Sequence, residues 1–161
     1  MSILVAYYSR TGCTRNVAEQ MAQSLRANLL ELQDQRNRAG VWGFIKGGFD
    51  AARKKPTELA AIDIDLATYE LVIIGSPVWA GTICPAVRTF LQQSAATIPR
   101  AAFFCTHGGG GASQSYADAE RLFHKPLEAT VALRDKDVKS NETDQAINTF
   151  ISHFVTKEEQ S

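Results

Sequence analysis

Three short segments of the chain combine residue types that bind anions or flat aromatic rings. The first follows the apolar run 3–8 and leads into a segment whose apolar residues recur at helical spacing. The first N–H groups of such a helix lack intrahelical partners and carry a partial positive charge, so they favour an anion. An ordinary capped strand-to-helix turn has the same residue types. The predicted phosphate-binding residues are Ser9, Arg10, Thr11, Gly12, Cys13 and Thr14.

The second segment follows the apolar run 71–74 and places a tryptophan between a proline and a glycine. An indole on such a loop suits stacking on a flat aromatic ligand, and the neighbouring backbone could hydrogen-bond the ligand's edge. The alternative is that the indole only covers the core. The predicted ligand-binding residues of this segment are Pro77, Val78, Trp79, Ala80 and Gly81.

The third segment follows the apolar run 101–105 and contains four consecutive glycines, 108–111. Glycine N–H groups can turn inward as an anion-binding nest, although a flexible solvent loop has the same composition. The spacing is not a dinucleotide fingerprint, because Ser113 stands where the last glycine would be. His107 could donate to a ligand or serve only the loop's own structure. The predicted binding residues here are Thr106, His107, Gly108, Gly109 and Gly110.

Five apolar runs of strand length alternate with helical segments, which predicts an α/β protein. These runs are residues 3–8, 29–32, 71–74, 101–105 and 127–133. Parallel neighbours need crossover connections and both sheet faces must be covered, so we expect a three-layer, doubly wound, five-stranded parallel sheet. Ligands of such sheets lie beyond the carboxyl ends of the strands, where all three segments fall.

Two parts of the chain need separate predictions. We expect the last helix to begin after Asn141, which has the residue type of an N-cap.

Residues 34–60 depart from the alternation of strands and helices. Their apolar residues recur at helical spacing but glycines interrupt them, so we expect a broken helix on the surface.

Length and composition restrict the class of protein. At 161 residues, of which 45% are hydrophobic, the chain is expected to form a single domain over residues 1–161. Lys plus Arg and Asp plus Glu number 17 each, so no net charge attracts nucleic acid or an anionic membrane. No apolar run predicts a membrane span, and no signal-peptide pattern is present. Cys13, Cys84 and Cys105 are widely spaced, so we expect a cytoplasmic protein without disulfides or a metal site.

Together the three segments resemble the cofactor loops of the flavodoxin-like superfamily, and the resemblance covers nearly the whole chain. Residues 9–14 match its Ser/Thr-x-Thr-Gly-x-Thr loop, which binds the phosphate of FMN, and residues 71–81 and 106–110 are similar to its flavin-ring loops. The resemblance implies strand order 2-1-3-4-5, with FMN bound non-covalently where the winding reverses. Cys13 stands where many relatives have Asn. The third loop also lacks the acidic residue and the tyrosine that short electron carriers have there.

The resemblance implies an electron-transfer flavoprotein that works with a redox partner protein. An FMN-dependent NAD(P)H:quinone oxidoreductase is one alternative, and a non-redox module that binds FMN or another phosphorylated ligand is another. We expect a monomer or a weak dimer. Lys and Arg outnumber acidic residues over 36–55, so this segment could meet an acidic partner or the phosphate of NADPH, or form a solvated face. The three loops contain no Asp or Glu, which predicts that the flavin is reduced more easily than in acidic flavodoxins.

Overall fold

The computed structural model describes residues 1–36 and 40–155, without the side chains of residues 40–42 and 44. Strands and helices alternate along most of this length, as the apolar periodicity predicts. The strands are β1 (Ile3–Tyr7), β2 (Asn28–Glu31), β3 (Leu71–Trp79), β4 (Thr82–Ile83), β5 (Ala101–His107) and β6 (Thr130–Arg134). The helices are α1 (Cys13–Leu25), α2 (Gly40–Ala52), α3 (Pro85–Ser94), α4 (Ala112–Phe123), α5 (Asp135–Lys139) and α6 (Asp144–Val155), with a 3₁₀ turn η1 (Leu66–Thr68).

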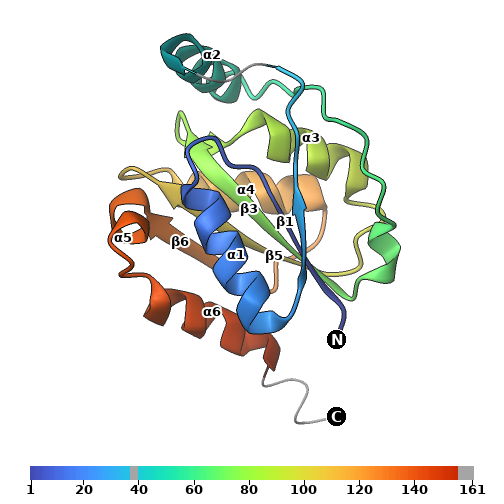
Figure 1. The fold of residues 1–161 in the computed structure, drawn as a ribbon. Helices are drawn as coiled ribbons and strands as arrows, with labels where there is room; N and C mark the ends of the chain where they lie inside the picture. The colour runs from blue at the N-terminus through green and yellow to red at the C-terminus, as the bar shows by residue number, and fades with distance from the viewer. Residues whose placement is uncertain (37–39, 156–161) are drawn as a thin grey trace.

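The sheet has the predicted doubly wound topology (Figure 1). Its parallel strands follow the order β2-β1-β3-β5-β6, which is 2-1-3-4-5 when the parallel strands are numbered along the chain. In the centre, Ile73 of β3 lies opposite Val5 of β1 and Ala102 of β5. The winding reverses between β1 and β3, so the loops that follow these two strands lead away to opposite faces.

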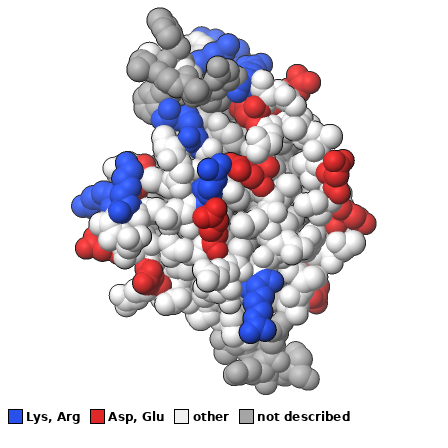
Figure 2. Space-filling view, in the orientation of Figure 1, with Lys and Arg blue, Asp and Glu red and all other residues white. Residues whose placement is uncertain are grey.

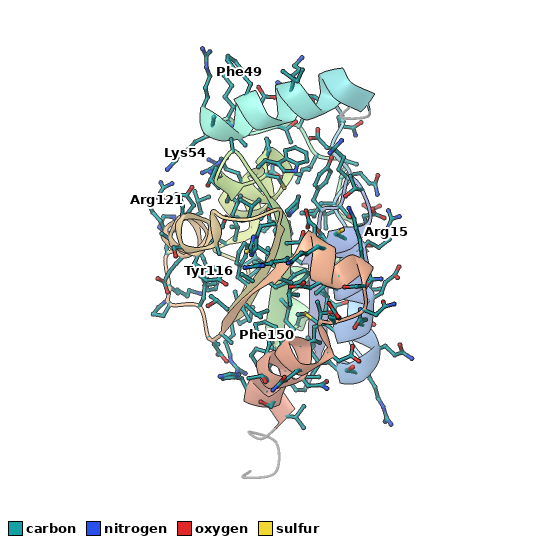
Figure 3. The ribbon with its side chains drawn as sticks, turned by 90° about the vertical axis from the view of Figure 1, so that its left-hand side faces the viewer. Arg15, Phe49, Lys54, Tyr116, Arg121 and Phe150 are labelled. Atoms are coloured by element: carbon teal, nitrogen blue, oxygen red, sulfur yellow. The ribbon has the colours of Figure 1, made fainter. Side chains whose placement is uncertain are left out.

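The two faces of the sheet are covered by different helices, because successive side chains of a strand point to opposite sides. Leu4 and Phe103 belong to the core shared with α3 and α4. Their neighbours Val5 and Phe104 belong to the core shared with α1 and α6. Figure 3 shows the layers edge on, with α1, α5 and α6 on one side and α4 on the other. The predicted three-layer arrangement is confirmed.

The predicted loop after the third apolar run is a β-hairpin. Strand β3 continues through the proline to Trp79, which pairs with Thr82 of the antiparallel strand β4. Ala80 and Gly81 form the turn with φ of 49° and 80°. Two positive φ values are typical of a type I′ turn, whose twist matches that of the flanking strands. The expectation that Trp79 lies on a loop between a strand and a helix was therefore wrong, since it stands at the end of strand β3.

Two helix predictions also need correction. Helix α2 is continuous, and its Gly43 and Gly47 lie on the buried face, where close packing offsets their low helix propensity. Residues 37–39 of the same segment lie outside the described residues. Asn141 does not cap the last helix, since it follows the unpredicted helix α5 and has a φ of 58°. The carbonyl of Thr143 accepts from Ile147 N–H at the start of α6.

Helix α2 lies at the end of the molecule where the loop after β1 turns (Figure 1). Lys and Arg side chains gather around this end in Figure 2, whereas Asp and Glu dominate the right-hand edge. None of the helices that the structure describes is both long and apolar enough to cross a bilayer.

Candidate functional site

A hollow of about 360 Å³ lies at the carboxyl ends of β1, β3 and β5. The three sequence segments meet there, as expected for ligand sites of doubly wound sheets. Helix α5 also contributes to its lining. The lining residues are Arg10, Thr11, Cys13, Thr14, Pro77, Val78, Trp79, Thr106, Gly108, Asp135 and Lys139.

The amino end of α1 faces this hollow. Gly12 precedes the helix with a φ of 101°, a conformation that favours glycine. Its N–H donates to Ser9 Oγ at 3.1 Å, which closes the turn. In this fully described part of the chain, no side chain caps α1 and its first turn contains no acidic residue. The free N–H groups and the helix dipole therefore remain available to an anion.

A hydroxyl pair joins the first segment to the third. Thr14 Oγ1 and Thr106 Oγ1 lie 2.8 Å apart, and either can donate. Both side chains are buried. This bond fixes the start of α1 against the end of β5, so the anion site and the glycine segment keep one relative position.

Trp79 is held from two sides at the rim of the hollow. The ring of Tyr8 meets it edge-on, with centroids 5.5 Å apart and an interplanar angle of 87°. On its other side the indole meets the backbone of Gly47 in α2, which is so close that a Cβ at this glycine would lie 2.8 Å from Trp79 Cζ3. The indole therefore has a fixed direction where it borders the hollow.

The four glycines of the third segment have different roles. Gly111 precedes α4 with a φ of 88°, and a Cβ there would lie 2.5 Å from Val78 Cγ1, so the fold itself requires glycine. A Cβ at Gly108, Gly109 or Gly110 would meet no atom within 4 Å. Their φ values are not positive either. The packing of the protein itself does not require glycine at these three positions. A ligand that lay directly against this backbone would require it, because a Cβ would occupy the ligand's space.

A buried charge network supports the hairpin that carries Trp79. Asp118 of α4 accepts hydrogen bonds from Thr82 of β4, from Arg88 of α3 at 3.2 Å and from Lys54 after α2 at 3.2 Å. Asp118 and Arg88 are almost fully buried. Burial raises the pKa of Asp118, but the bonds from Thr82, Lys54, Arg88 and Gln114 outweigh it and hold the pKa below its usual range. The carboxylate thereby ties β4, α2 and α3 to α4.

Several predicted residues do not line the hollow. Ser9 is engaged by Gly12 N–H and borders a separate hollow of about 220 Å³ beside β2. Gly12, Ala80 and Gly81 form turns, and Gly109 and Gly110 lie beside the lining residue Gly108. His107 Nδ1 is buried without a hydrogen-bond partner among the described residues, so its role as a donor stays a prediction.

The sequence reasoning missed Asp135 and Lys139 of α5, which line the hollow. They follow the last parallel strand, so the rule that ligands lie beyond the carboxyl ends of strands could have found them. Helix α5, with the sequence DKDVK, lacks the glycine and hydroxyl residues by which the other three segments were recognised. The three segments contain no Asp or Glu, but Asp135 of α5 brings a carboxylate to the hollow.

Thiols and clusters of metal ligands are further groups that could carry chemistry. All three cysteines are buried and free. Burial raises the pKa of Cys84 to about 11 and that of Cys105 to about 12, so both thiols stay protonated at neutral pH. The residues that the structure describes include no cluster of His, Cys, Asp or Glu able to hold a metal ion.

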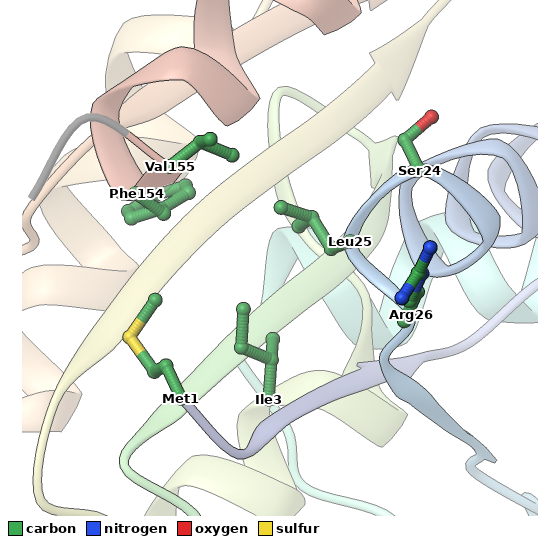
Figure 4. A pocket seen from close by; sticks show the side chains of 7 residues that line it. All are labelled: Met1, Ile3, Ser24, Leu25, Arg26, Phe154 and Val155. Atoms are coloured by element: carbon green, nitrogen blue, oxygen red, sulfur yellow. The ribbon is translucent and has the colours of Figure 1, made fainter. Parts of the chain in front are cut away.

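A second hollow, of about 340 Å³, lies at the opposite end of the sheet (Figure 4). Met1 and Ile3 from the start of β1 line it, together with the last residues of α1 and α6. No predicted site residue belongs to it.

Comparison with known proteins agrees with this architecture. A family model described as flavodoxin matches residues 2–153. A search of curated proteins finds no significant match. A flavoprotein from Lactobacillus acidophilus, crystallised in complex with FMN, is 25% identical and covers 86% of this chain and 97% of its own, with a TM-score of 0.71.

More distant structures share the fold. Oxidised flavodoxin 2 from Bacillus cereus is 19% identical, with coverage of 96% and 100% and a TM-score of 0.54. Rubredoxin:oxygen oxidoreductase from Desulfovibrio gigas is 16% identical, and the match covers 93% of this chain but 37% of that one, with a TM-score of 0.54.

Proposed function

The chain belongs to the flavodoxin family, and we propose that it binds FMN non-covalently at the carboxyl ends of its strands and transfers electrons through it. The observation that carries this proposal is the uncapped amino end of α1, which opens onto a hollow bordered by an oriented indole and by glycines that the fold does not need. A phosphate, a flat ring and a close backbone approach would each meet a matching surface there.

The residues present fit FMN. Its phosphate is a dianion, and α1 offers unpaired N–H groups together with the hydroxyl of Thr11. The ring needs an apolar cover, which Trp79 supplies at the rim. Its polar edge needs backbone donors with space in front of them, and the open surroundings of Gly108 to Gly110 provide that space.

When bound, FMN supplies the redox chemistry, because its ring accepts and returns electrons. The protein's part is to bind and orient it. Trp79 is held by Tyr8 and by α2, so it would exclude water from one side of the ring without reorganising. The Thr14–Thr106 pair would keep the phosphate and ring positions at a fixed distance.

A visible absorption spectrum of the purified protein, with FMN added to the apo form, tests this function. We expect a flavin band and quenching of tryptophan fluorescence on FMN binding, which Trp79→Ala should remove and Trp42→Phe should leave in place. No flavin band with any flavin would contradict the proposal and favour a non-redox module. Quenching that persists undiminished in Trp79→Ala would contradict the place given to the indole.

We expect a less negative potential for full reduction of the bound FMN than in an acidic flavodoxin. Full reduction adds negative charge to the flavin, which carboxylates disfavour and cations favour. Arg10 and Lys139 outnumber Asp135 at the hollow. A redox titration beside an acidic flavodoxin checks this, and an equally negative potential would instead support a ferredoxin-like role.

The same two cations favour a second candidate function, the NAD(P)H-dependent reduction of a quinone. Arg10 and Lys139 could hold an anionic cosubstrate at the mouth of the site. Turnover of NADPH with a soluble quinone by the isolated FMN-loaded protein distinguishes this enzyme from a carrier that needs a protein partner.

A further inference from the structure

Helix α2 exposes the two large apolar side chains that the structure describes on it, Ile45 and Phe49. Among the α2 residues whose side chains are described, Gly43, Gly47 and Ala51 are buried, whereas Ile45 and Phe49 are 53% and 51% exposed. An ordinary surface helix does the reverse and turns its large apolar residues to the core. Gly47 lets α2 approach Trp79 closely, while Ile45 and Phe49 face solvent.

The same outer side is positively charged. We call the exposed group formed by Ile45, Lys46, Phe49, Arg53 and Lys55 the α2 surface. The side-chain ammonium groups of Lys46 and Lys55 form no hydrogen bond or ion pair with any described residue, and the guanidinium of Arg53 lies over the Phe49 ring at 4.0 Å. Figure 3 shows Phe49 on the side of α2 that faces away from the sheet.

Two described carboxylates that contact this part of the chain, Asp50 and Asp118, are paired with cations outside the α2 surface. Asp50, the acidic residue of α2, is buried and paired with Arg36 at 3.3 Å. Lys54 is paired with Asp118. These two ion pairs, at Arg36 and Lys54, fix both ends of the chain segment that contains α2 to the body of the protein. Among the residues that the structure describes, no carboxylate pairs with the cations of the α2 surface, in a chain whose net charge is zero.

The α2 surface is next to the proposed cofactor site. The inner side of α2 contacts Trp79 through Gly47, and Trp79 lines the hollow. A protein bound on the outer side would therefore lie one helix and one indole away from the cofactor.

We propose that the α2 surface is the docking site for an acidic redox protein, whose carboxylates surround an apolar patch that receives Phe49 and Ile45. The inference rests on the proposed function and names the kind of partner. Aromatic and arginine side chains at the centre of a patch are typical of protein interfaces, and the stacked Arg53 and Phe49 are already ordered for binding. Charges of opposite sign would steer the encounter.

A protein partner fits this surface better than an anionic membrane does. A helix that lies in a bilayer interface presents a continuous apolar face. On α2 the exposed Lys46 directly follows Ile45, and Arg53 covers the ring of Phe49, so cations and apolar groups are mixed on one side. Mixed surfaces of this kind match a protein with acidic and apolar groups in a complementary arrangement.

The test measures the rate at which a pre-reduced acidic [2Fe–2S] ferredoxin reduces the FMN-loaded protein, followed by stopped-flow absorbance. The wild-type rate should fall at least tenfold between 20 mM and 500 mM salt, as expected for opposite charges. Lys46→Glu and Phe49→Ser should each lower the rate at low salt at least fivefold. Arg26→Glu, which makes the same charge change at the opposite end of the molecule, should leave it within twofold. Oxidation of the reduced protein by basic cytochrome c should instead become faster with salt.

FMN affinity and the visible spectrum are measured first for every variant, so failure of the proposed function is seen separately as a loss of FMN binding by the wild type. With FMN bound, a ferredoxin rate insensitive to salt, or one lowered equally by Arg26→Glu, overturns the inference. Binding to phosphatidylserine vesicles that Phe49→Ser abolishes, without a change in the ferredoxin rate, also overturns it in favour of a membrane. A dimer that Phe49→Ser dissociates in sedimentation velocity overturns it in favour of a second copy.

Discussion

The two ends of the sheet carry hollows of similar size, about 360 Å³ at the carboxyl ends of the strands and about 340 Å³ at the amino ends. The first faces the start of α1, where N–H groups are unpaired, and the second faces the end of the same helix at Ser24, Leu25 and Arg26. The helix dipole favours an anion at its start and disfavours one at its end. The volumes alone therefore do not distinguish the two hollows as places for an anion, whereas the direction of the strands and helices does.

The walls of the two hollows are also stabilised differently. Apolar side chains such as Ile3, Leu25 and Phe154 form much of the amino-end hollow (Figure 4). At the carboxyl end, the hairpin with Trp79 depends on the bond between Thr82 and the buried Asp118. Polar networks of this kind fix geometry but are sensitive to the loss of one partner.

The largest effect is expected for Asp118→Asn, which leaves the buried Arg88 without its counter-ion. Breaking a buried ion pair costs about 3 to 5 kcal/mol of unfolding free energy. Urea unfolding followed by circular dichroism measures it, with Asp63→Asn, an exposed carboxylate, as the control. A loss of less than about 1 kcal/mol would mean that the hairpin does not depend on this network.

The same variant has a pH signature. The pKa of Asp118 is lowered on folding from its ordinary value of 3.8, so the stability it contributes is complete above that value and is lost as pH falls through the folded-state pKa. The stability difference between wild type and Asp118→Asn should be full at pH 7 and shrink below about pH 4. Urea titrations at several pH values check this, and a difference that stays constant down to pH 3 would contradict it.

A matched pair of hydroxyl deletions compares the two ends of α1. Thr11→Ala removes a donor at the anion-binding end and should weaken FMN binding by about 1 to 3 kcal/mol, the range for a hydrogen bond to a charged group. Ser24→Ala removes a hydroxyl from the other hollow and should leave FMN affinity unchanged. Fluorescence titration measures both, and equal effects would remove the distinction between the two hollows.

The smallest effects separate the glycines at the rim of the carboxyl-end hollow. Gly111→Ala should destabilise the apo fold by at least about 1 to 2 kcal/mol, because its positive φ strains an alanine and the added Cβ would lie 2.5 Å from Val78 Cγ1 and 2.8 Å from Gly81 Cα. Gly109→Ala should leave the apo fold unchanged and weaken FMN binding by about 1 kcal/mol, since its added methyl group meets no protein atom and occupies the space proposed for the ligand. Unfolding and binding titrations of both variants check this. Loss of apo stability in Gly109→Ala would assign that glycine to the fold.

Sequence alone predicted the sheet, because apolar runs and helical periodicity reflect burial that every element of this fold requires. It misjudged 75–82 as a loop, since a strand with a proline and a two-residue turn reads like a loop. It predicted a broken α2 because the contact of Gly47 with Trp79 is tertiary and leaves no local pattern. Asp135 and Lys139 were missed for a similar reason, since the short helix α5 brings them to the site only in the folded chain.

The relative affinity of the apo protein for FMN and riboflavin tests the central claim most directly, that the open start of α1 binds the phosphate. The two ligands share the ring and differ in the phosphate, so Trp79 and the glycines would contact both alike. The account predicts that FMN binds at least about tenfold more tightly, because a charged group gains the N–H donors of α1 and the hydroxyl of Thr11. Equal dissociation constants for FMN and riboflavin would contradict it.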